Sequence, residues 1–225
     1  MNPESQHEPK ERELRGWHSR GYLPHFDAGE CVTQFVTFRL ADSVPQSVIE
    51  RWQAQLHARP EAERKAELHR LIEAFLDTGC GACHLRNARI ASLVERALLF
   101  FDAQRYQLHA WVVMPNHVHV LFAPASGWSL SDILASWKSF TAKEANKLLR
   151  RTGKFWQEDY FDRYPRNEHH FNRIIEYVAL NPVKAGLCSE AGDWPFGSAC
   201  SRWEAEAGGT PALRGEGQNP ARSDS

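Results

Sequence analysis

The sequence predicts an α+β fold in which helices pack on an antiparallel sheet. Three segments of the 225-residue chain are rich in β-branched and aromatic residues, as strands are; they span residues 31–40, 106–113 and 117–123. The last two flank a Met-Pro-Asn turn and predict a hairpin. Helical patterns fall between the other strands, which favours this class.

Four stretches place apolar residues at helical spacing. They span residues 44–77, 90–101, 130–151 and about 168–180. The first is split near Pro60, because proline interrupts helices. Ser129 or Ser131 lies near the N-cap of the third. The fourth is expected to stop at Asn181-Pro182, with Gly186 just beyond.

Composition excludes a wholly disordered chain, since 42% of the residues are hydrophobic. Lys and Arg total 27 against 28 Asp and Glu, so no global basic excess indicates a polyanion partner, although a local basic face would suffice. No segment approaches the ~20 apolar residues of a membrane span. The polar N-terminus lacks the apolar stretch of a signal peptide. We therefore expect a cytoplasmic protein without a membrane partner.

The chain divides into three parts by composition. Residues 1–28 are polar, contain Gly and Pro, and are expected to form a flexible N-terminal arm. Residues 29–201 form the expected folded domain. Residues 202–225 are small and polar and predict a disordered tail.

Two histidines on one predicted strand form the first candidate site. His117 and His119 are two residues apart, so their imidazoles point to the same face of the strand. Two convergent imidazoles provide much of a divalent-metal site. The alternative is a pair of polar residues on a solvated strand face. The apolar residues around the pair favour a buried strand, where unpaired imidazoles are costly.

Tyr177 and Asn181 form the second candidate site. They are four residues apart, and therefore lie on one helix face, one turn from each other. A phenol can attack a phosphodiester, but its pKa near 10 makes it weak at neutral pH without a metal or a basic neighbour. The Asn carbonyl oxygen could bind that metal. Taken alone, a tyrosine near a helix end is more often an ordinary core residue.

Together, these features carry a family resemblance. The strings VVMPNHVHVLF and EYVALNPVKAGL occur in this order, about 60 residues apart. They resemble the single-tyrosine HUH transposases of the IS200-like superfamily, and most closely the REP-associated tyrosine transposases. Further blocks support the resemblance, which covers about residues 17–200: QFVTFRL, YQLHAWVV, SWKSFTA, FWQEDYFDRY and DWPFGSA.

The resemblance implies a ferredoxin-like antiparallel sheet, the HUH endonuclease fold, with the histidine strand central and the tyrosine helix against it. It implies that His117 and His119 bind Mg²⁺ or Mn²⁺, with Asn181 as a third ligand. It also implies that Tyr177 attacks single-stranded DNA, giving a 5′-phosphotyrosine and a free 3′-OH. Residues 44–100 exceed what a minimal member needs and are interpreted as a helical insertion.

The implied partners are single-stranded DNA hairpins formed by REP-like palindromes, bound by a monomer or a homodimer in the nucleoid. Basic residues of the segment 130–163 are candidates for phosphate contacts. They are Lys138, Lys143, Lys147, Arg150, Arg151 and Arg163. The alternative for those in the predicted helix is an ordinary solvated helix face.

The five cysteines are odd in number and scattered, unlike a disulfide framework. Cys80, Cys83 and His84 satisfy the CxxCH pattern of haem attachment, but no export signal accompanies it and no second CxxC exists for zinc. We interpret this stretch as a turn before the helix at Ile90.

Three functions from different classes are compatible with the motifs. The first is the metal-dependent nuclease and strand transferase described above. The second is a domesticated protein that binds hairpins without cleaving them, which the presence of both histidines, the tyrosine and the Asn disfavours. The third is a metal phosphodiesterase that uses water and forms no covalent intermediate.

Overall fold

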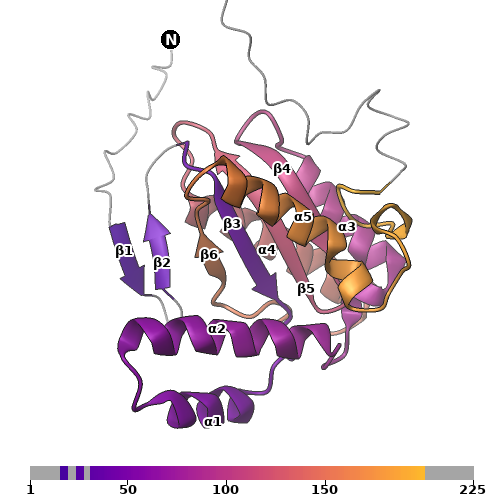
Figure 1. Ribbon diagram of the computed structural model, residues 1–225. Helices are drawn as coiled ribbons and strands as arrows, with labels where there is room; N and C mark the ends of the chain where they lie inside the picture. Colours follow the sequence, from indigo (N-terminus) through magenta and orange to yellow (C-terminus); the bar gives the residue numbers. More distant parts are fainter. Residues whose placement is uncertain (1–15, 20–23, 28–30, 201–225) are drawn as a thin grey trace, which may run out of the picture.

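A four-stranded antiparallel sheet forms the centre of the molecule (Figure 1). The computed structural model describes residues 16–19, 24–27 and 31–200. The strands of this sheet are β3 (Gln34–Arg39), β4 (Tyr106–Val113), β5 (His117–Pro124) and β6 (Phe161–Arg163). The helices are α1 (Gln46–Leu56), α2 (Glu61–Asp77), α3 (Ala88–Leu99), α4 (Leu130–Leu148) and α5 (Glu168–Lys184), with single 3₁₀ turns η1 (His84–Arg86) and η2 (Ala191–Asp193).

The sheet has ferredoxin-like topology, as the resemblance implied. Its spatial order is β4-β5-β3-β6, and every neighbouring pair is antiparallel. In chain order, β3 is followed by helices, then the β4-β5 hairpin, then α4 and β6, which is the split βαβ arrangement. The histidine strand β5 is interior and pairs with β3 on one side and β4 on the other.

Helices cover both faces of the sheet. Side chains alternate along β5, so Val118 and Val120 pack in the larger core with α3 and α4. Leu121 points to the opposite face and packs with Ile174 and Val178 of α5. In Figure 1, α5 crosses one face of the sheet, and α3 and α4 lie behind it. None of the helices in the described ranges is long and apolar enough to cross a membrane.

The α1-α2 pair has a hydrophobic core of its own, formed around Ile49, Leu56, Leu68 and Ile72. In Figure 1 the two helices lie at the lower end of the sheet, and α2 is closer to the sheet than α1 is. A hydrogen bond fixes α2 to the β4-β5 turn: the Asn116 side-chain amide donates to the Leu76 carbonyl at 3.1 Å.

Most elements expected from the sequence are confirmed within a few residues. The first helical stretch is divided, as Pro60 predicted, with α1 ending at Leu56 and α2 beginning at Glu61. Ser129, rather than Ser131, caps α4 by accepting from the backbone N–H of Asp132. This helix ends at Leu148, three residues before its expected end.

The expected end of the last helix at Asn181-Pro182 is wrong, because α5 continues to Lys184. Proline lacks one N–H, but near the end of a helix the following turn can still form. The backbone N–H of Ala185 donates to the Asn181 carbonyl at 3.0 Å, and that of Leu187 donates to the Pro182 carbonyl at 2.9 Å. Gly186, with φ of +68°, follows the helix end.

Three short strands were not anticipated. β6 is a three-residue edge strand, too short for a periodicity to reveal. Within the expected arm of residues 1–28, β1 (Gly16–Ser19) and β2 (Pro24–Asp27) pair with each other in an antiparallel two-stranded sheet. The arm is therefore not wholly irregular, since turn-forming Gly and Pro also separate short strands. The expected tail at 202–225 lies outside the described residues.

Candidate active site

The β5 strand places two imidazoles on the α5 face of the sheet. His117 and His119 are each 1% exposed. Their Nε2 atoms are 3.0 Å apart. The buried strand predicted from the surrounding apolar residues is confirmed, and the alternative of a solvated face is wrong.

Hydrogen bonds to the outer ring nitrogens define the two tautomers. The Asn116 amide donates to the Leu76 and Cys80 carbonyls, so its oxygen accepts from His117 Nδ1 at 2.7 Å. The Nε2 atom of His117 therefore carries a lone pair and accepts from His119 Nε2. In this arrangement, the Thr37 hydroxyl donates to His119 Nδ1 at 2.8 Å. Because a hydroxyl can also accept, Thr37 can support the other tautomer of His119.

Burial keeps both imidazoles neutral. It lowers the pKa of His117 to about 4, against a smaller opposing effect of Glu73. Burial also lowers the pKa of His119 well below its ordinary value, and His117 adds to this shift. Neutral imidazole is the form that binds metal ions, so these histidines are ready to act as ligands at neutral pH.

The α5 helix brings Tyr177 against the histidine pair. The rings of Tyr177 and His119 meet edge to face, with centroids 5.3 Å apart and an interplanar angle of 71°. The ring of Phe35, on β3, also meets the Tyr177 ring edge to face, with centroids 5.9 Å apart. Lys184 Nζ lies 5.1 Å from the centroid of the Tyr177 ring. Burial raises the pKa of Tyr177 far above its ordinary value, and the charge of Glu73 adds to this. The phenol is therefore protonated in the free protein.

Asn181 lies one helical turn after Tyr177, as its spacing predicted. Its side chain is 2% exposed, and its Oδ1 atom is buried without a hydrogen-bond partner. A hydrogen bond from Asn181 to the Tyr177 oxygen counteracts part of the upward shift of the tyrosine pKa. The amide oxygen is thus available as an acceptor for a group that enters the site.

The donor atoms suit a divalent cation. Two nitrogens 3.0 Å apart have the separation expected of neighbouring ligands with bonds of about 2.1 Å to one ion. The unpartnered oxygen of Asn181 is a third donor of the kind that Mg²⁺ and Mn²⁺ accept. Among the described residues, no three His, Cys, Asp or Glu side chains already surround a common ion position.

The α2 helix contributes two residues that the sequence motifs did not indicate. His69 stacks on Phe161 of β6, with ring centroids 3.3 Å apart. Its Nε2 lies 3.3 Å from Glu73 Oε1, one turn further along α2. Burial tends to raise the pKa of Glu73, but His69, Arg163 and His117 together outweigh it, so the pKa is lowered and the group is a carboxylate. Only the fold brings this helix to the histidine strand.

The predicted DNA-contact residues fall into two groups. Arg163 of β6 lies near Tyr177, and its guanidinium is 5.0 Å from the centroid of the Phe35 ring. The others lie in α4 or just after it, and α4 covers the opposite face of the sheet. Within this group, Lys143 and Arg150 are exposed, and Lys147 pairs with Glu144 at 2.8 Å. Phosphate contacts by these residues remain a prediction.

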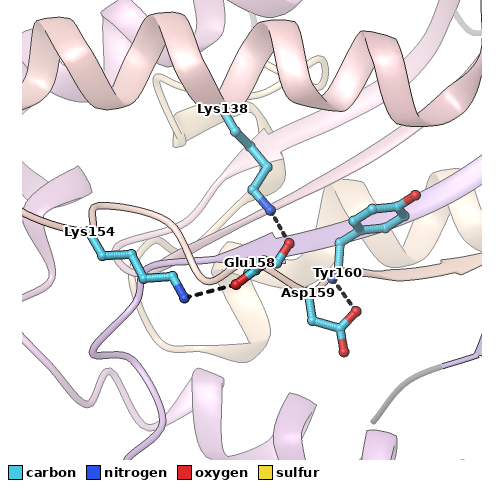
Figure 2. Close-up of polar contacts among 5 residues, drawn as sticks. All are labelled: Lys138, Lys154, Glu158, Asp159 and Tyr160. Atoms are coloured by element: carbon cyan, nitrogen blue, oxygen red, sulfur yellow. Dashed lines mark hydrogen bonds and ion pairs between the residues drawn. The ribbon is translucent and has the colours of Figure 1, made fainter. Parts of the chain in front are cut away.

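Lys138 and Arg151 have structural partners. Figure 2 shows Lys138 Nζ donating to the Glu158 carbonyl at 2.7 Å, while Lys154 Nζ lies 3.5 Å from Glu158 Oε2. Burial lowers the pKa of Lys138 to about 8. The Arg151 guanidinium donates a hydrogen bond to His84 Nε2 at 2.8 Å. Both residues therefore connect elements around α4, in addition to any role with DNA.

The CxxCH stretch forms the turn expected before α3. Cys80 and Cys83 are free thiols, and Cys83 has φ of +47°. The Cys83 thiol donates to the Gly79 carbonyl at 3.0 Å. The His84 ring contacts the Arg151 guanidinium. Cys83 and His84 are therefore both engaged in local contacts.

Comparison with known proteins finds similarity to one family of transposases. The family model described as transposase IS200-like matches residues 89–181, which include both histidines and Tyr177 and end at Asn181. The REP-associated tyrosine transposase of Escherichia coli (strain K12) is 26% identical over 91 residues, 40% of this chain and 53% of that protein. The match thus spans about half the length of that relative.

Two further similarities extend over more of the chain. A relative in Haemophilus influenzae that carries the same family name is 24% identical over 127 residues, 50% of this chain and 72% of that protein. A solved structure of a REP-associated tyrosine transposase bound to a REP hairpin is 18% identical, with a TM-score of 0.49, and covers 88% of this chain and 91% of that chain. The resemblance predicted from the motifs is confirmed: residues 89–181 match the transposase IS200-like family model, and the chain is similar to REP-associated tyrosine transposases.

Proposed function

We propose that this protein is a metal-dependent single-stranded DNA endonuclease and strand transferase that acts on REP-like hairpins. The observation that carries this proposal is the contact between the Tyr177 ring and His119, on the same face of the sheet where the two imidazoles converge. A core tyrosine would not require two buried, neutral histidines beside it. The names of the relatives supply the class of DNA.

The cleavage step exchanges one phosphoester bond for another. The Tyr177 oxygen attacks the scissile phosphorus, the bond from phosphorus to the 3′-oxygen breaks, and a 5′-phosphotyrosine forms. The phenol loses its proton, and the departing 3′-oxygen gains one. The phosphotyrosine keeps the bond energy, so a different 3′-OH can attack it in the reverse sense. No nucleotide cofactor is needed.

His117, His119 and Asn181 would hold the cation, Mg²⁺ or Mn²⁺. When bound, it supplies Lewis-acid polarisation of the scissile phosphate. The chain's own residues orient the reacting groups. Asn116 and Thr37 fix the planes of the two imidazoles, and the α5 backbone fixes the distance from Tyr177 to Asn181.

The buried phenol needs positive charge nearby before it can react. Because its pKa is raised, the phenol is protonated in the free protein and is a poor nucleophile before DNA is bound. Arg163 already counteracts part of this shift, and Lys184 Nζ lies 5.1 Å from the centre of the phenol ring. We assign these two side chains to charge compensation around the scissile phosphate. We propose that the enzyme acts on chromosomal DNA at the nucleoid.

A denaturing gel with labelled single-stranded hairpin oligonucleotides tests the function. The oligonucleotides come from repeats next to the protein's own gene and are incubated with Mn²⁺ or with EDTA. A protein-linked band that needs Mn²⁺ and disappears in Tyr177→Phe is the expected result. Tyr164→Phe is the matched control and keeps the band.

Other outcomes select the remaining functions. Cleaved DNA without a linked band would indicate a phosphodiesterase that uses water. A gel shift without cleavage under several metals would indicate a protein that only binds hairpins. Unchanged cleavage by Tyr177→Phe would show that another group is the nucleophile.

A further inference from the structure

We propose that the groove between α3 and α4 is an interface between two copies of this chain, related by a two-fold axis along the groove. The two helices pack on the face of the sheet opposite to α5, so the groove lies away from Tyr177 and the two histidines. The inference is independent of the proposed function, because none of its residues belongs to the histidine and tyrosine site.

Two adjoining hollows of about 490 and 660 Å³ form the groove. Both are lined by Leu93 and Arg96 of α3 and by Phe140 of α4, so they are continuous with each other. The second hollow extends to Ala88 at the start of α3 and to Leu148 at the end of α4. The two helices are therefore antiparallel, and the groove follows both of them.

The groove carries apolar side chains that a monomer would leave in water. Among the residues that the structure describes, the large apolar side chains that are at least half exposed are Phe100, Phe140 and Leu148, at 69%, 52% and 50%. All three line the groove. Soluble monomers rarely gather exposed apolar side chains into one patch, and such a patch commonly marks a protein interface.

The charges along the groove favour a second copy of the same surface as its partner. Arg89 of α3 and Glu144 of α4 line the same hollow. A two-fold axis along the groove places each α3 over the α4 of the other copy and keeps positions along the groove unchanged. Arg89 of each copy then faces Glu144 of the other, so the interface contains this ion pair twice. Glu144 can supply it, since its pair with Lys147 at 2.8 Å is at the surface and contributes little.

The size of this face predicts a weak dimer. The 12 residues of α3 extend about 18 Å, at a rise of about 1.5 Å per residue. Two adjacent helices are about 20 Å wide, so each copy contributes on the order of 400 Å². Two copies together stay below the ~1,200 Å² at which stable complexes begin. We therefore expect monomer and dimer to exchange in the micromolar range, with the α5 faces of both copies directed away from the interface.

Sedimentation velocity of the full chain at a series of micromolar concentrations, without DNA or metal, tests the proposal. We expect the sedimentation coefficient to rise with concentration toward that of a dimer. Glu144→Arg and Arg89→Glu should each weaken association about tenfold or more, because each sets like charges against one another twice. The chain that carries both changes exchanges the two charges and should associate as the wild type does.

Glu67→Arg is the matched control, because Glu67 also pairs with a basic residue three positions along, Arg70, but lies on α2 outside the groove. It should associate as the wild type does, whereas Phe140→Ser should weaken association. Near-ultraviolet circular dichroism of each variant confirms that the fold is retained. A wild type that is monomeric at every concentration would overturn the proposal and leave the groove to a different protein. Association that survives Glu144→Arg and Phe140→Ser, or that the double charge exchange does not restore, would also overturn this interface.

Discussion

The buried state of His117 makes the stability of the metal-free protein depend on pH in a defined direction. Its pKa falls from 6.5 in an unfolded chain to about 4 in the fold, because burial disfavours the charged ring. Between these values the unfolded chain binds the proton and the folded protein does not, so stability is lost as the pH falls. The full effect is about 3 kcal/mol, of which about 2 kcal/mol lies between pH 7 and pH 5.

Urea unfolding in EDTA, followed by tryptophan fluorescence at pH 7 and pH 5, measures this effect. The comparison is with His117→Gln, which keeps a polar side chain but does not titrate. The wild type should lose about 2 kcal/mol more than the variant over this interval. The carboxylates and His119 also change the free energy of unfolding with pH, and they do so in both proteins. Only the difference between the wild type and His117→Gln therefore reports on His117. Equal losses in the two proteins would show that His117 is not buried in its neutral form.

Three further predictions concern the surroundings of the histidines. Asn116→Ala removes hydrogen bonds to His117, Leu76 and Cys80, and should lower the free energy of unfolding by about 1–3 kcal/mol in urea titrations. Thr37→Val leaves His119 Nδ1 without a partner, and should weaken Mn²⁺ binding about 10-fold or more by calorimetry. Gly81→Ala should lower the melting temperature, because the added Cβ would lie 2.8 Å from the Asp42 carbonyl at φ of +87°; an unchanged value would contradict this.

Local patterns predicted much of the site. Alternation along β5 placed His117 and His119 on one face, and the four-residue spacing placed Tyr177 and Asn181 on one side of α5. These relations depend only on the geometry of a strand and a helix. The strands of the hairpin followed in the same way from their β-branched and aromatic residues.

The missed features depend on contacts between distant segments. His69 of α2 stacks on Phe161 of β6 only because α2 folds against the sheet, and the helical pattern of α2 does not distinguish this face from a solvated one. The end of α5 was misjudged because proline near a helix C-terminus removes just one hydrogen bond. The strand β6 forms because β3 offers an unpaired edge, which three residues do not reveal.

The Thr37 hydroxyl has a consequence for the proton balance of metal binding. Both imidazoles are neutral before an ion arrives, and the hydrogen on His119 Nε2 can move to Nδ1 while the hydroxyl turns from donor to acceptor. The ring thus rearranges its hydrogen internally and releases none to the solvent. The heat of Mn²⁺ binding near pH 7 should therefore be the same in buffers with different ionisation enthalpies, and the proposed cation site would respond near this pH to metal supply alone.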